Sequence, residues 1–255
     1  MATYLTFQLS GMLSAFGLVA VGEVRLSAGH PTRSAVLGLL AGALGIRRGE
    51  EDRLAALTDG YGLAVRVDAP GSPLLDFHTV QTPPERKNRI YRTRADELGG
   101  LLGVDEEPYT ILSRRGYLCD AHFTACLWAV TDEPPFRLEI LAEALRRPVF
   151  APYLGRKCCP PSLPFAPRVG EYDNVEAALA AYTLDRQAFP QGRKRPGTCL
   201  LFADQGAQAG NCTQQALVRD RTAHHGRRQF DERREVMRTV PPAGIGKKEA
   251  GRVPQ

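Results

Sequence analysis

The sequence predicts an α+β fold with the element order βαββαβ, the split βαβ or ferredoxin-like plan. Three observations predict it. Residues 3–10 and 117–130 alternate apolar and polar side chains, as half-buried strands do. Residues 31–45 and 136–147 each carry an apolar stripe at helical spacing. A polar, basic excursion over residues 82–110 then separates two of the strands without disturbing this order.

The first predicted strand lies at the start of the chain. In residues 3–10, Leu5, Phe7 and Leu9 face one side and the polar residues between them face the other. We expect an irregular, glycine-rich connection from there to Gly29.

The first predicted helix, residues 31–45, has two different faces, and Gly45 can end it. One face is an apolar stripe of Val36, Leu39, Leu40, Ala43 and Leu44. The other is smooth, because Ser34, Gly38 and Gly42 follow one another at intervals of four. Each glycine costs roughly 1 kcal/mol relative to alanine inside a helix. Either a sheet or a ligand backbone must therefore come close to this face, and the sequence favours a sheet.

Residues 61–68 and 75–81 are predicted strands joined by a Pro-Gly-Ser-Pro turn at residues 70–73. The excursion that follows, residues 82–110, is either a long surface loop or a hairpin that stands out from the body. Long loops in compact domains are uncommon and usually functional.

The rest of the chain completes the order and then becomes less regular. After the strand at 117–130 and the helix at 136–147, a strand at 149–154 is the last of the βαββαβ set. The C-terminal half is expected to be modified and partly irregular, with a helix at 175–182, strands at 198–203 and 234–240, and a disordered basic tail at 241–255. We expect one domain over residues 1–240.

Positive charge is concentrated in two places. Residues 1–215 carry 23 basic and 23 acidic side chains, whereas residues 216–255 carry 10 basic and 5 acidic ones. Residues 86–94, RKNRIYRTR, contain five basic side chains, a tyrosine and no acidic residue. Clustered cations around an aromatic residue can follow a phosphate backbone, although a solvated loop has the same composition.

The chain lacks the marks of a membrane or secreted protein. Its longest apolar run, residues 35–46, has twelve residues, which is too short to span a bilayer. No basic residue precedes Arg25, so the start is a poor secretion signal. Six cysteines, mostly in apolar stretches, do not make a disulfide scaffold. We expect a cytoplasmic protein.

The stretch at residues 154–165, LGRKCCPPSLPF, allows three interpretations. A metal site is disfavoured, because Cys158 and Cys159 are adjacent and no Cys-x-x-Cys spacing occurs, so we expect no metal and no cofactor. A disulfide between neighbouring cysteines would be strained. The third interpretation is a phosphate cradle, with Gly155 turning the backbone and Arg156 and Lys157 supplying charge. A stiff, proline-rich connection remains the alternative.

Four stretches together resemble a known family. They are LSGMLSAFG (9–17), HPTRSAVLGLLAGALGI (30–46), FHTVQ (77–81) with LSRRGYLCDAHF (112–123), and LRRPVFAPYLGRKCCPPSLPF (145–165). With the element order they cover about residues 3–165, and more loosely 228–240. They resemble the CasD family, the RAMP-fold subunits that cap the 5′ end of the guide RNA in type I-E CRISPR surveillance complexes (Cascade).

The resemblance implies a fold and a role. The fold is an RRM-like (RAMP) palm with an inserted β-hairpin thumb, about residues 82–112, and a glycine-rich loop at 154–165. The role is non-catalytic: the subunit grips the 5′ handle of the crRNA, contacts the CasC backbone subunit and the large CasA subunit, and meets target DNA only through the complex. A separate subunit, CasE, processes the RNA. The candidate RNA-binding residues are Arg33, Ser34, His78, Thr79, Gln81, Arg86, Lys87, Arg89, Arg92, Arg94, Arg114, Arg115, Gly155, Arg156 and Lys157.

The chain departs from the family pattern in its first loop. Residues 13–17 read Leu-Ser-Ala-Phe-Gly where the family often has Leu-Gln-Ser-Trp-Gly. If the glutamine and tryptophan contact RNA in relatives, the contact differs here.

Two alternative functions remain open. A related subunit in another CRISPR subtype cuts precursor crRNA without a metal, which requires a general base and an acid or cation. His30 and His78, with Tyr117 and Lys157, are the candidates for that chemistry. The other alternative is a free-standing RNA-binding protein of the same fold.

Overall fold

The computed structural model describes residues 1–20, 22–83, 90–99, 109–184, 196–207, 214–227 and 229–244. Within these residues the fold is α+β, dominated by one nine-stranded sheet in the order β10-β11-β9-β5-β7-β1-β8, with β3 and β6 also paired to β7. Apart from the parallel pair of β3 and β7, neighbouring strands are antiparallel. No helix in the described part of the chain is long and apolar enough to span a bilayer.

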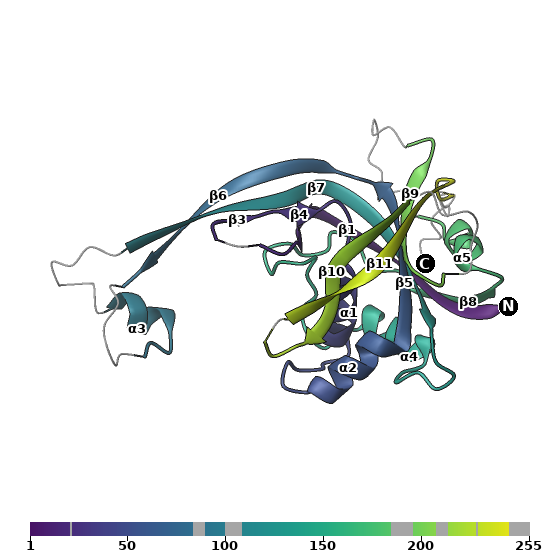
Figure 1. The fold of residues 1–255 in the computed structure, drawn as a ribbon, viewed down its shortest axis with the longest axis horizontal. Helices are drawn as coiled ribbons and strands as arrows, with labels where there is room; N and C mark the ends of the chain where they lie inside the picture. Colours follow the sequence, from purple (N-terminus) through teal and green to yellow (C-terminus); the bar gives the residue numbers. More distant parts are fainter. Residues whose placement is uncertain are drawn as a thin grey trace, which may run out of the picture.

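The centre of the sheet has the predicted element order. Strands β1 (Ala2–Ser14), β5 (Tyr61–Ala69), β7 (Tyr109–Ala129) and β8 (Arg168–Tyr172) lie side by side in the order β8-β1-β7-β5. Helix α1 (Arg33–Ala43) lies between β1 and β5 in the chain, and α4 (Leu138–Arg146) lies between β7 and β8. Both helices pack on the same face of the sheet (Figure 1).

The last strand of this set is β8, so the strand predicted at residues 149–154 is wrong. Val149 and Phe150 donate their backbone N–H groups to the carbonyls of Ala43 and Gly42, at 3.0 and 3.2 Å. Pro148 and Pro152 have no N–H to give a sheet. These residues therefore follow the end of α1 instead of pairing as a strand.

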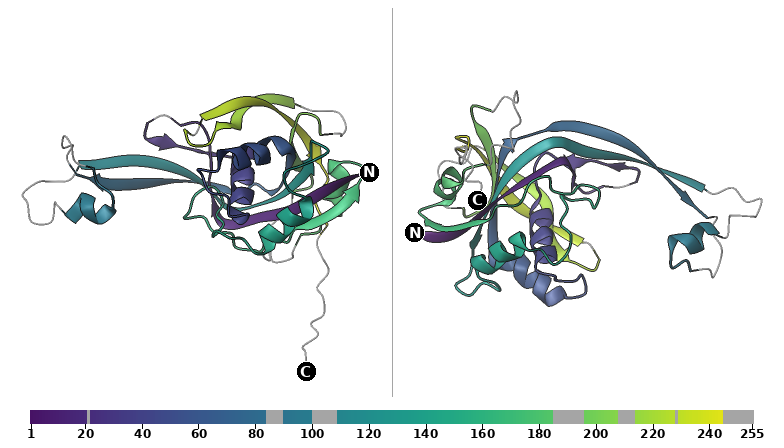
Figure 2. Two further views of the ribbon diagram at one scale, coloured as in Figure 1. Left: turned by 90° about the horizontal axis from the view of Figure 1, so that it is seen from below. Right: turned by 180° about the vertical axis from the view of Figure 1, so that it is seen from behind.

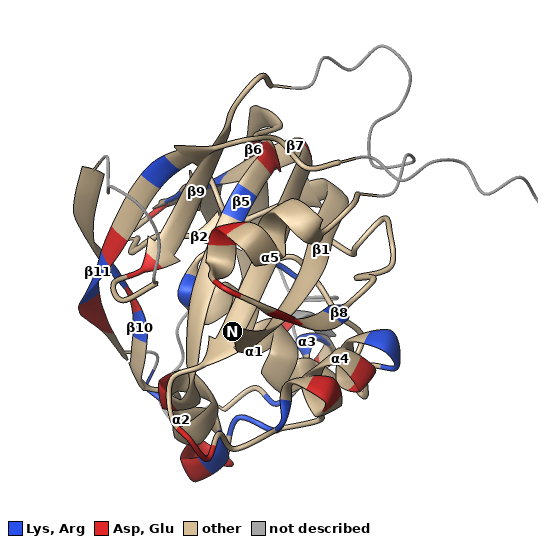
Figure 3. Ribbon diagram, turned by 90° about the vertical axis from the view of Figure 1, so that its right-hand side faces the viewer, with Lys and Arg blue, Asp and Glu red and all other residues tan. Residues whose placement is uncertain are grey.

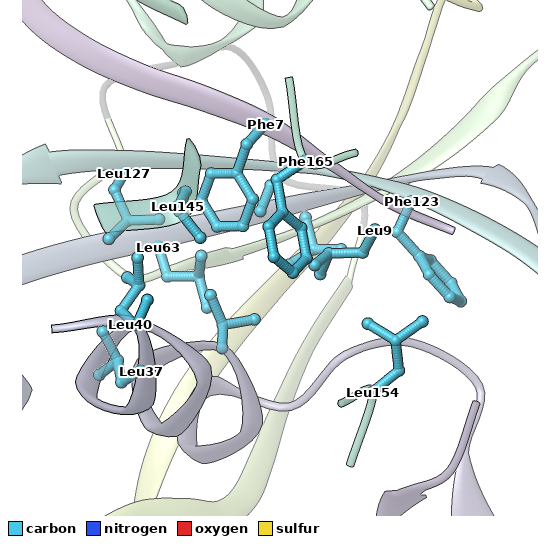
Figure 4. Close-up of a cluster of buried hydrophobic side chains, with 14 of the residues drawn as sticks. Phe7, Leu9, Leu37, Leu40, Leu63, Phe123, Leu127, Leu145, Leu154 and Phe165 are labelled. Atoms are coloured by element: carbon cyan, nitrogen blue, oxygen red, sulfur yellow. The ribbon is translucent and has the colours of Figure 1, made fainter. Parts of the chain in front are cut away.

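The hydrophobic core lies between the sheet and the two helices (Figure 4). Phe7, Leu9, Phe123 and Leu127 reach it from β1 and β7, and Leu40 reaches it from α1. The two residues of the unusual first loop are also buried: Ser14 is 0% exposed, and Phe16 is 2% exposed and packs edge-to-face on Phe123 with ring centroids 5.6 Å apart. The departures at these positions therefore change packing inside the protein.

Two elements at the edge of the core were not predicted. Helix α2 (Glu51–Gly60) buries only Leu54, Leu57, Thr58 and Gly60, which is too short a pattern to identify from sequence. Strand β10 (Gln214–His224) is mostly exposed, so it lacks an apolar alternation. It pairs with β11 (Gln229–Val240), which pairs with β9 (Cys199–Asp204), and β9 extends the sheet from β5.

Smaller elements complete the body. Strands β2 (Phe16–Gly17) and β4 (Ser27–Ala28) pair with each other, and β3 (Val24–Arg25) pairs with β7. Helix α5 (Val175–Ala181) begins at Asn174, whose side chain accepts from the Ala177 N–H at 2.8 Å. The prediction of disorder from residue 241 is wrong for residues 241–244, because Ala243 is buried and the Gly244 carbonyl accepts from Leu184 N–H at 3.0 Å. Residues 245–255 lie outside the described chain.

A long hairpin projects from this body (Figures 1 and 2). It is formed by β6 (Ser72–Thr82) and the first half of β7, and we call residues 72–82 and 109–119 the projecting hairpin. Helix α3 (Arg94–Gly99) lies at its far end. The hairpin begins at residue 72, whereas the sequence predicted an excursion from residue 82.

The Pro-Gly-Ser-Pro segment bends the chain without reversing it. Strands β5 and β6 pair with successive halves of the same strand β7, so the predicted turn between them is a kink between two strands that both follow β7. Gly71 makes the kink possible, with φ of +73° and a position where a Cβ would lie 2.5 Å from the Cys119 carbonyl oxygen.

Candidate nucleic-acid interface

An open groove of about 990 Å³ runs beside α1. Its floor is the exposed face of α1, and its walls come from the segment at 150–158 and from β10 and β11. Arg115, from the projecting hairpin, also lines it. Besides residues of α1, the lining includes Gly17, Arg47, Arg48, Arg115, Phe150, Tyr153, Gly155, Arg156, Lys157, Cys158, Thr222, His225 and Phe230.

The groove floor is the smooth stripe of the first helix. Ser34, Gly38 and Gly42 all line it, and a Cβ placed on either glycine would meet no other atom within 4 Å, the helix's own nearby backbone aside. The sequence favoured close packing of a sheet against this stripe, and that expectation is wrong. The glycines leave space that the described chain does not fill.

Replacing both glycines with alanine should therefore stabilise the protein. Gly38→Ala and Gly42→Ala should each raise the free energy of unfolding by about 0.5–1 kcal/mol, because alanine is the better helix former and its methyl group meets no neighbour. Urea unfolding followed by circular dichroism measures this. Gly62→Ala is the contrast, since its Cβ would lie 2.2 Å from Trp128. A loss of stability in the α1 variants would contradict the open floor.

The groove is lined by five cationic side chains, Arg47, Arg48, Arg115, Arg156 and Lys157. No aspartate or glutamate is among the described residues that line it. Within the described chain none of the five forms an ion pair with a carboxylate, in contrast to arginines such as Arg66 and Arg233. Unpaired cations on one concave surface create a positive potential that attracts a polyanion.

Arg47 and Arg48 were missed by the sequence reasoning. They are exposed and follow Gly45, whose φ of +75° ends the helix and turns the chain. The available signal was two adjacent arginines that begin two residues after a helix-ending glycine, but the sequence reasoning gave its attention to the larger basic cluster at 86–94.

The loop after Leu154 depends on Gly155. This residue has φ of +85°, and a Cβ there would lie 1.9 Å from the Ala15 carbonyl oxygen. Two backbone hydrogen bonds hold Leu154 in place. Its N–H donates to the Cys159 carbonyl at 2.7 Å, and its carbonyl accepts from Ala15 N–H at 3.0 Å. The predicted turn at Gly155 is thus present, and it packs directly against the end of β1.

Arg156 stabilises this loop through hydrogen bonds and also adds positive charge to the groove. Its guanidinium donates to the carbonyls of Gly116 and Arg25, at 3.2 and 3.0 Å, and lies 4.6 Å from the centre of the Tyr117 ring. None of these partners is a carboxylate, so the positive charge is not neutralised. Lys157, the next residue, is exposed.

The two cysteines of the loop have different environments. Cys158 is exposed, with its Sγ 3.8 Å from the Tyr117 hydroxyl, whereas Cys159 is fully buried. Burial raises the pKa of the Cys159 thiol to about 12, so it stays protonated and acts as a small apolar side chain. Among the described residues, no three His, Cys, Asp or Glu side chains gather where they could hold a metal ion.

Arg33 was predicted to contact RNA, and the structure gives it a different role. Its side chain is buried, pairs with Asp204, and donates to the Thr58 and Tyr61 carbonyls at 2.6 and 2.7 Å. Its backbone N–H donates to Asp220. Arg33 therefore joins α1 to the strands β9 and β10 and does not present its charge to a ligand.

Arg33 belongs to a buried ionic network that spans β9, β10 and β11. Arg233 pairs with Asp204, Asp220 and Glu235 at 3.0, 2.6 and 2.7 Å. His30 completes the network through Glu235, at 3.3 Å. Figure 3 shows acidic and basic residues close together along β10 and β11.

The candidate residues on the projecting hairpin fall on two opposite faces. Side chains directly across an antiparallel pair share a face, so His78, opposite Ser113, lies on the face of Tyr117 and Arg115. The predicted Thr79, Gln81 and Arg114 lie on the other face, opposite Leu112, Thr110 and Phe77 respectively. Only Arg115 of this set lines the groove.

The basic cluster near the hairpin tip is described only in part. Arg86, Lys87 and Arg89 lie outside the described residues. Arg92 is exposed, and Arg94 pairs with Glu97 at 2.7 Å and donates to the Gln81 carbonyl. Helix α3, which begins at Arg94, lies at the far end of the hairpin, away from α1 and the groove beside it (Figure 1).

The residues considered for RNA cleavage lie in two places. His78 contacts Asp76 at 2.8 Å and the Tyr117 hydroxyl at 3.2 Å, and burial raises the pKa of Tyr117. His30 instead stacks on Phe202 of β9, with ring centroids 3.7 Å apart, and pairs with Glu235. Among the described contacts, none joins His30 to His78.

Comparisons with known proteins agree with one another. Residues 4–241 match the family described as CRISPR-associated protein (Cas_Cas5). The chain is 33% identical over 182 residues to the CRISPR system Cascade subunit CasD of Escherichia coli (strain K12), covering 71% of this chain and 78% of the relative.

Two solved structures are similar over nearly the whole chain. One is a chain of a CRISPR RNA-guided surveillance complex, with a TM-score of 0.64, 25% identity, and coverage of 96% of this chain and 95% of that one. The other is titled "Crystal structure of Cas protein", with a TM-score of 0.56, 27% identity, and coverage of 95% and 98%. The matched region therefore includes the sheet, the projecting hairpin and the groove.

Proposed function

The chain belongs to the Cas5 family of CRISPR-associated proteins, as a CasD-type subunit of a Cascade surveillance complex, and we propose that it grips the 5′ handle of the guide crRNA in a type I-E complex. In this proposal, residues 1–240 form one RAMP-type domain: the four central strands with α1 and α4 are its ferredoxin-like palm, and the projecting hairpin is its thumb. The complex acts in the cytoplasm.

The observation that carries this proposal is the composition of the groove. It combines unpaired cations with a floor where no side chain projects from Gly38 or Gly42. A single-stranded RNA needs cations along its phosphates and a surface that its backbone can approach. The groove offers both, and Lys157, two residues after the turn at Gly155, lines it.

Protein partners are proposed for the projecting hairpin. It exposes Leu75 and Phe77 on one face and Val80 and Ile111 on the other, each at 39% or more. Isolated soluble proteins rarely leave apolar side chains exposed on both faces of a two-stranded ribbon. This supports contacts with the CasC backbone subunit and the large CasA subunit, with target DNA reached only through the assembled complex.

We also propose that the chain is not a nuclease. Metal-free RNA cleavage needs a general base and an acid or cation on opposite sides of one phosphate. His30, one of the two candidate bases, has a side chain only 15% exposed and is held by Glu235. His78 is therefore the remaining candidate base.

Three cations of the groove provide the direct test. In the variant Arg47→Gln, Arg48→Gln, Lys157→Gln, affinity for single-stranded handle RNA should fall on the order of 100-fold at 0.1 M salt. The slope of log affinity against log salt should decrease by about 2, since each lost phosphate contact contributes about 0.7. Fluorescence anisotropy with labelled RNA over a salt series measures both quantities.

A matched control removes the same charge elsewhere. Arg137, Arg147 and Arg219 are 78%, 88% and 56% exposed, and their triple glutamine variant should keep most of the affinity. If both triple variants bind equally weakly, only net charge matters and the groove assignment fails. If the purified chain cuts a repeat-containing transcript and His78→Ala abolishes the cut, the non-catalytic role fails.

A further inference from the structure

The groove wall between Pro148 and Leu154 carries two exposed aromatic side chains. Phe150 is 42% exposed and Tyr153 is 37% exposed, and both line the groove. In the described part of the chain, neither ring stacks on another aromatic ring or under a cation. Their faces are therefore available to a ligand.

The backbone that carries these rings is fixed at both ends. At one end, Val149 and Phe150 donate to the last carbonyls of α1. At the other, Leu154 is held between Ala15 and Cys159, and its side chain is 1% exposed. Pro152 restricts the backbone between them. Rings on such a segment lose little conformational freedom when they bind a ligand, which favours binding.

The surroundings of the rings indicate which ligand they suit. They line the same groove as Arg47, Arg48 and Lys157, and none of these cations has a carboxylate partner in the described chain. A protein partner would bring both charge signs to such a surface, whereas a nucleic acid brings phosphates and flat bases together. Nucleic-acid grooves that pair cations with aromatic rings hold bases by stacking.

We propose that Phe150 and Tyr153 form a stacking platform for an unpaired base of the RNA whose phosphates contact the groove cations. This inference rests on the proposed function. It assigns to these two side chains a preference for single-stranded RNA over paired RNA. A base within a duplex is already stacked on its neighbours and cannot offer its face. Stacking tolerates any base, so the platform recognises the unpaired state of the strand more than its sequence.

The test replaces the rings with aliphatic side chains of similar size. The full chain carrying Phe150→Leu and Tyr153→Leu should fold normally, because both positions are exposed, and should bind single-stranded handle RNA about 5- to 100-fold more weakly. The salt slope should stay unchanged, since no cation is lost. The conservative variant Phe150→Tyr, Tyr153→Phe should retain wild-type affinity.

A spectroscopic probe reads stacking directly. Handle RNAs with 2-aminopurine at successive positions should show one or two positions whose fluorescence is quenched on binding, and the leucine variant should lose that quenching. A fully paired duplex of the same sequence should bind the wild type and the leucine variant with equal affinity.

The outcomes separate this inference from the proposed function. If the leucine variant binds RNA like the wild type while the Arg47/Arg48/Lys157 variant does not, the stacking platform is wrong and the RNA groove stands. If neither variant loses affinity, both proposals fail. If the leucine variant binds RNA normally but no longer joins the assembled complex, the two rings form a protein contact and the inference is overturned.

Discussion

Replacing Asp204 with alanine is expected to destabilise the protein by about 3–5 kcal/mol, because the change leaves the buried Arg33 without its carboxylate partner and removes one of the three carboxylates that pair with the buried Arg233. Asp204 pairs with Arg33 and, at 3.0 Å, with Arg233, and it also accepts from the Leu63 N–H at 2.8 Å. Both arginine side chains are at most 11% exposed. Solvent therefore screens the remaining charge only weakly, and the cost is a large part of the 5–15 kcal/mol that stabilises a typical domain.

The matched control removes an exposed carboxylate from the same part of the fold. Asp59 pairs with Arg221 at 3.0 Å, but its side chain is 62% exposed, so Asp59→Ala should cost less than about 1 kcal/mol. Urea unfolding of the two variants gives the comparison. Adding Arg33→Met to Asp204→Ala should recover part of the loss, because one unpaired charge is then removed. Equal stabilities of the Asp204 and Asp59 variants would show that the network contributes little.

This network also explains the main error of the sequence reasoning. Arg33 begins a helix and stands in a stretch that resembles a family's RNA-contacting segment, so its charge was assigned to a ligand. Its partner Asp204 is 171 residues away in the chain, at the end of β9. Nothing local to Arg33 indicates that carboxylate. Ion pairs between distant segments depend on the completed sheet, and a single sequence does not record which strands become neighbours.

Local patterns were sufficient where the structure depends on local geometry. The alternation in β1 and β7 and the apolar stripes of α1 and α4 predicted the central order. The glycine and proline content of the 154–165 loop predicted a sharp turn that Gly155 does make. The same reasoning failed at residues 149–154, where an apolar run has its N–H groups taken by the end of α1. It also missed β10, whose exposed side chains follow no apolar period.

Some of the residues that line the groove could also be predicted from local sequence patterns. Arg156 and Lys157 were identified because they follow Gly155, and a glycine in a basic stretch indicates that the backbone must turn or be approached closely. Ser34 was identified from the family resemblance. Arg47 and Arg48 lie between Gly45 and Gly49, so the same glycine rule would have identified them. Phe150 and Tyr153 could not have been identified, because exposure of an aromatic ring is a property of the packed fold.

The second large effect is expected at Gly155, whose replacement by alanine should disable the groove. A Cβ there would lie 1.9 Å from the Ala15 carbonyl oxygen and 2.7 Å from its carbon. Both atoms belong to the backbone, so no side-chain rotation can relieve the contact. The φ of +85° adds strain of about 1–3 kcal/mol for any residue with a side chain. The loop must move away from β1 and carry Arg156 and Lys157 with it.

The affinity of the Gly155→Ala variant for RNA should therefore fall by more than the lower stability of the variant can explain. Two of the five groove cations are displaced together with Tyr153, so affinity for handle RNA should drop at least about tenfold while the protein stays folded at 25 °C. Gly49→Ala is the control, since a Cβ there meets nothing within 4 Å and Gly49 does not line the groove. Unfolding and RNA affinity are measured on both variants. An alanine variant that matches the wild type in both would mean that the loop can leave Ala15 without cost, and the shape of the groove would then not depend on this turn.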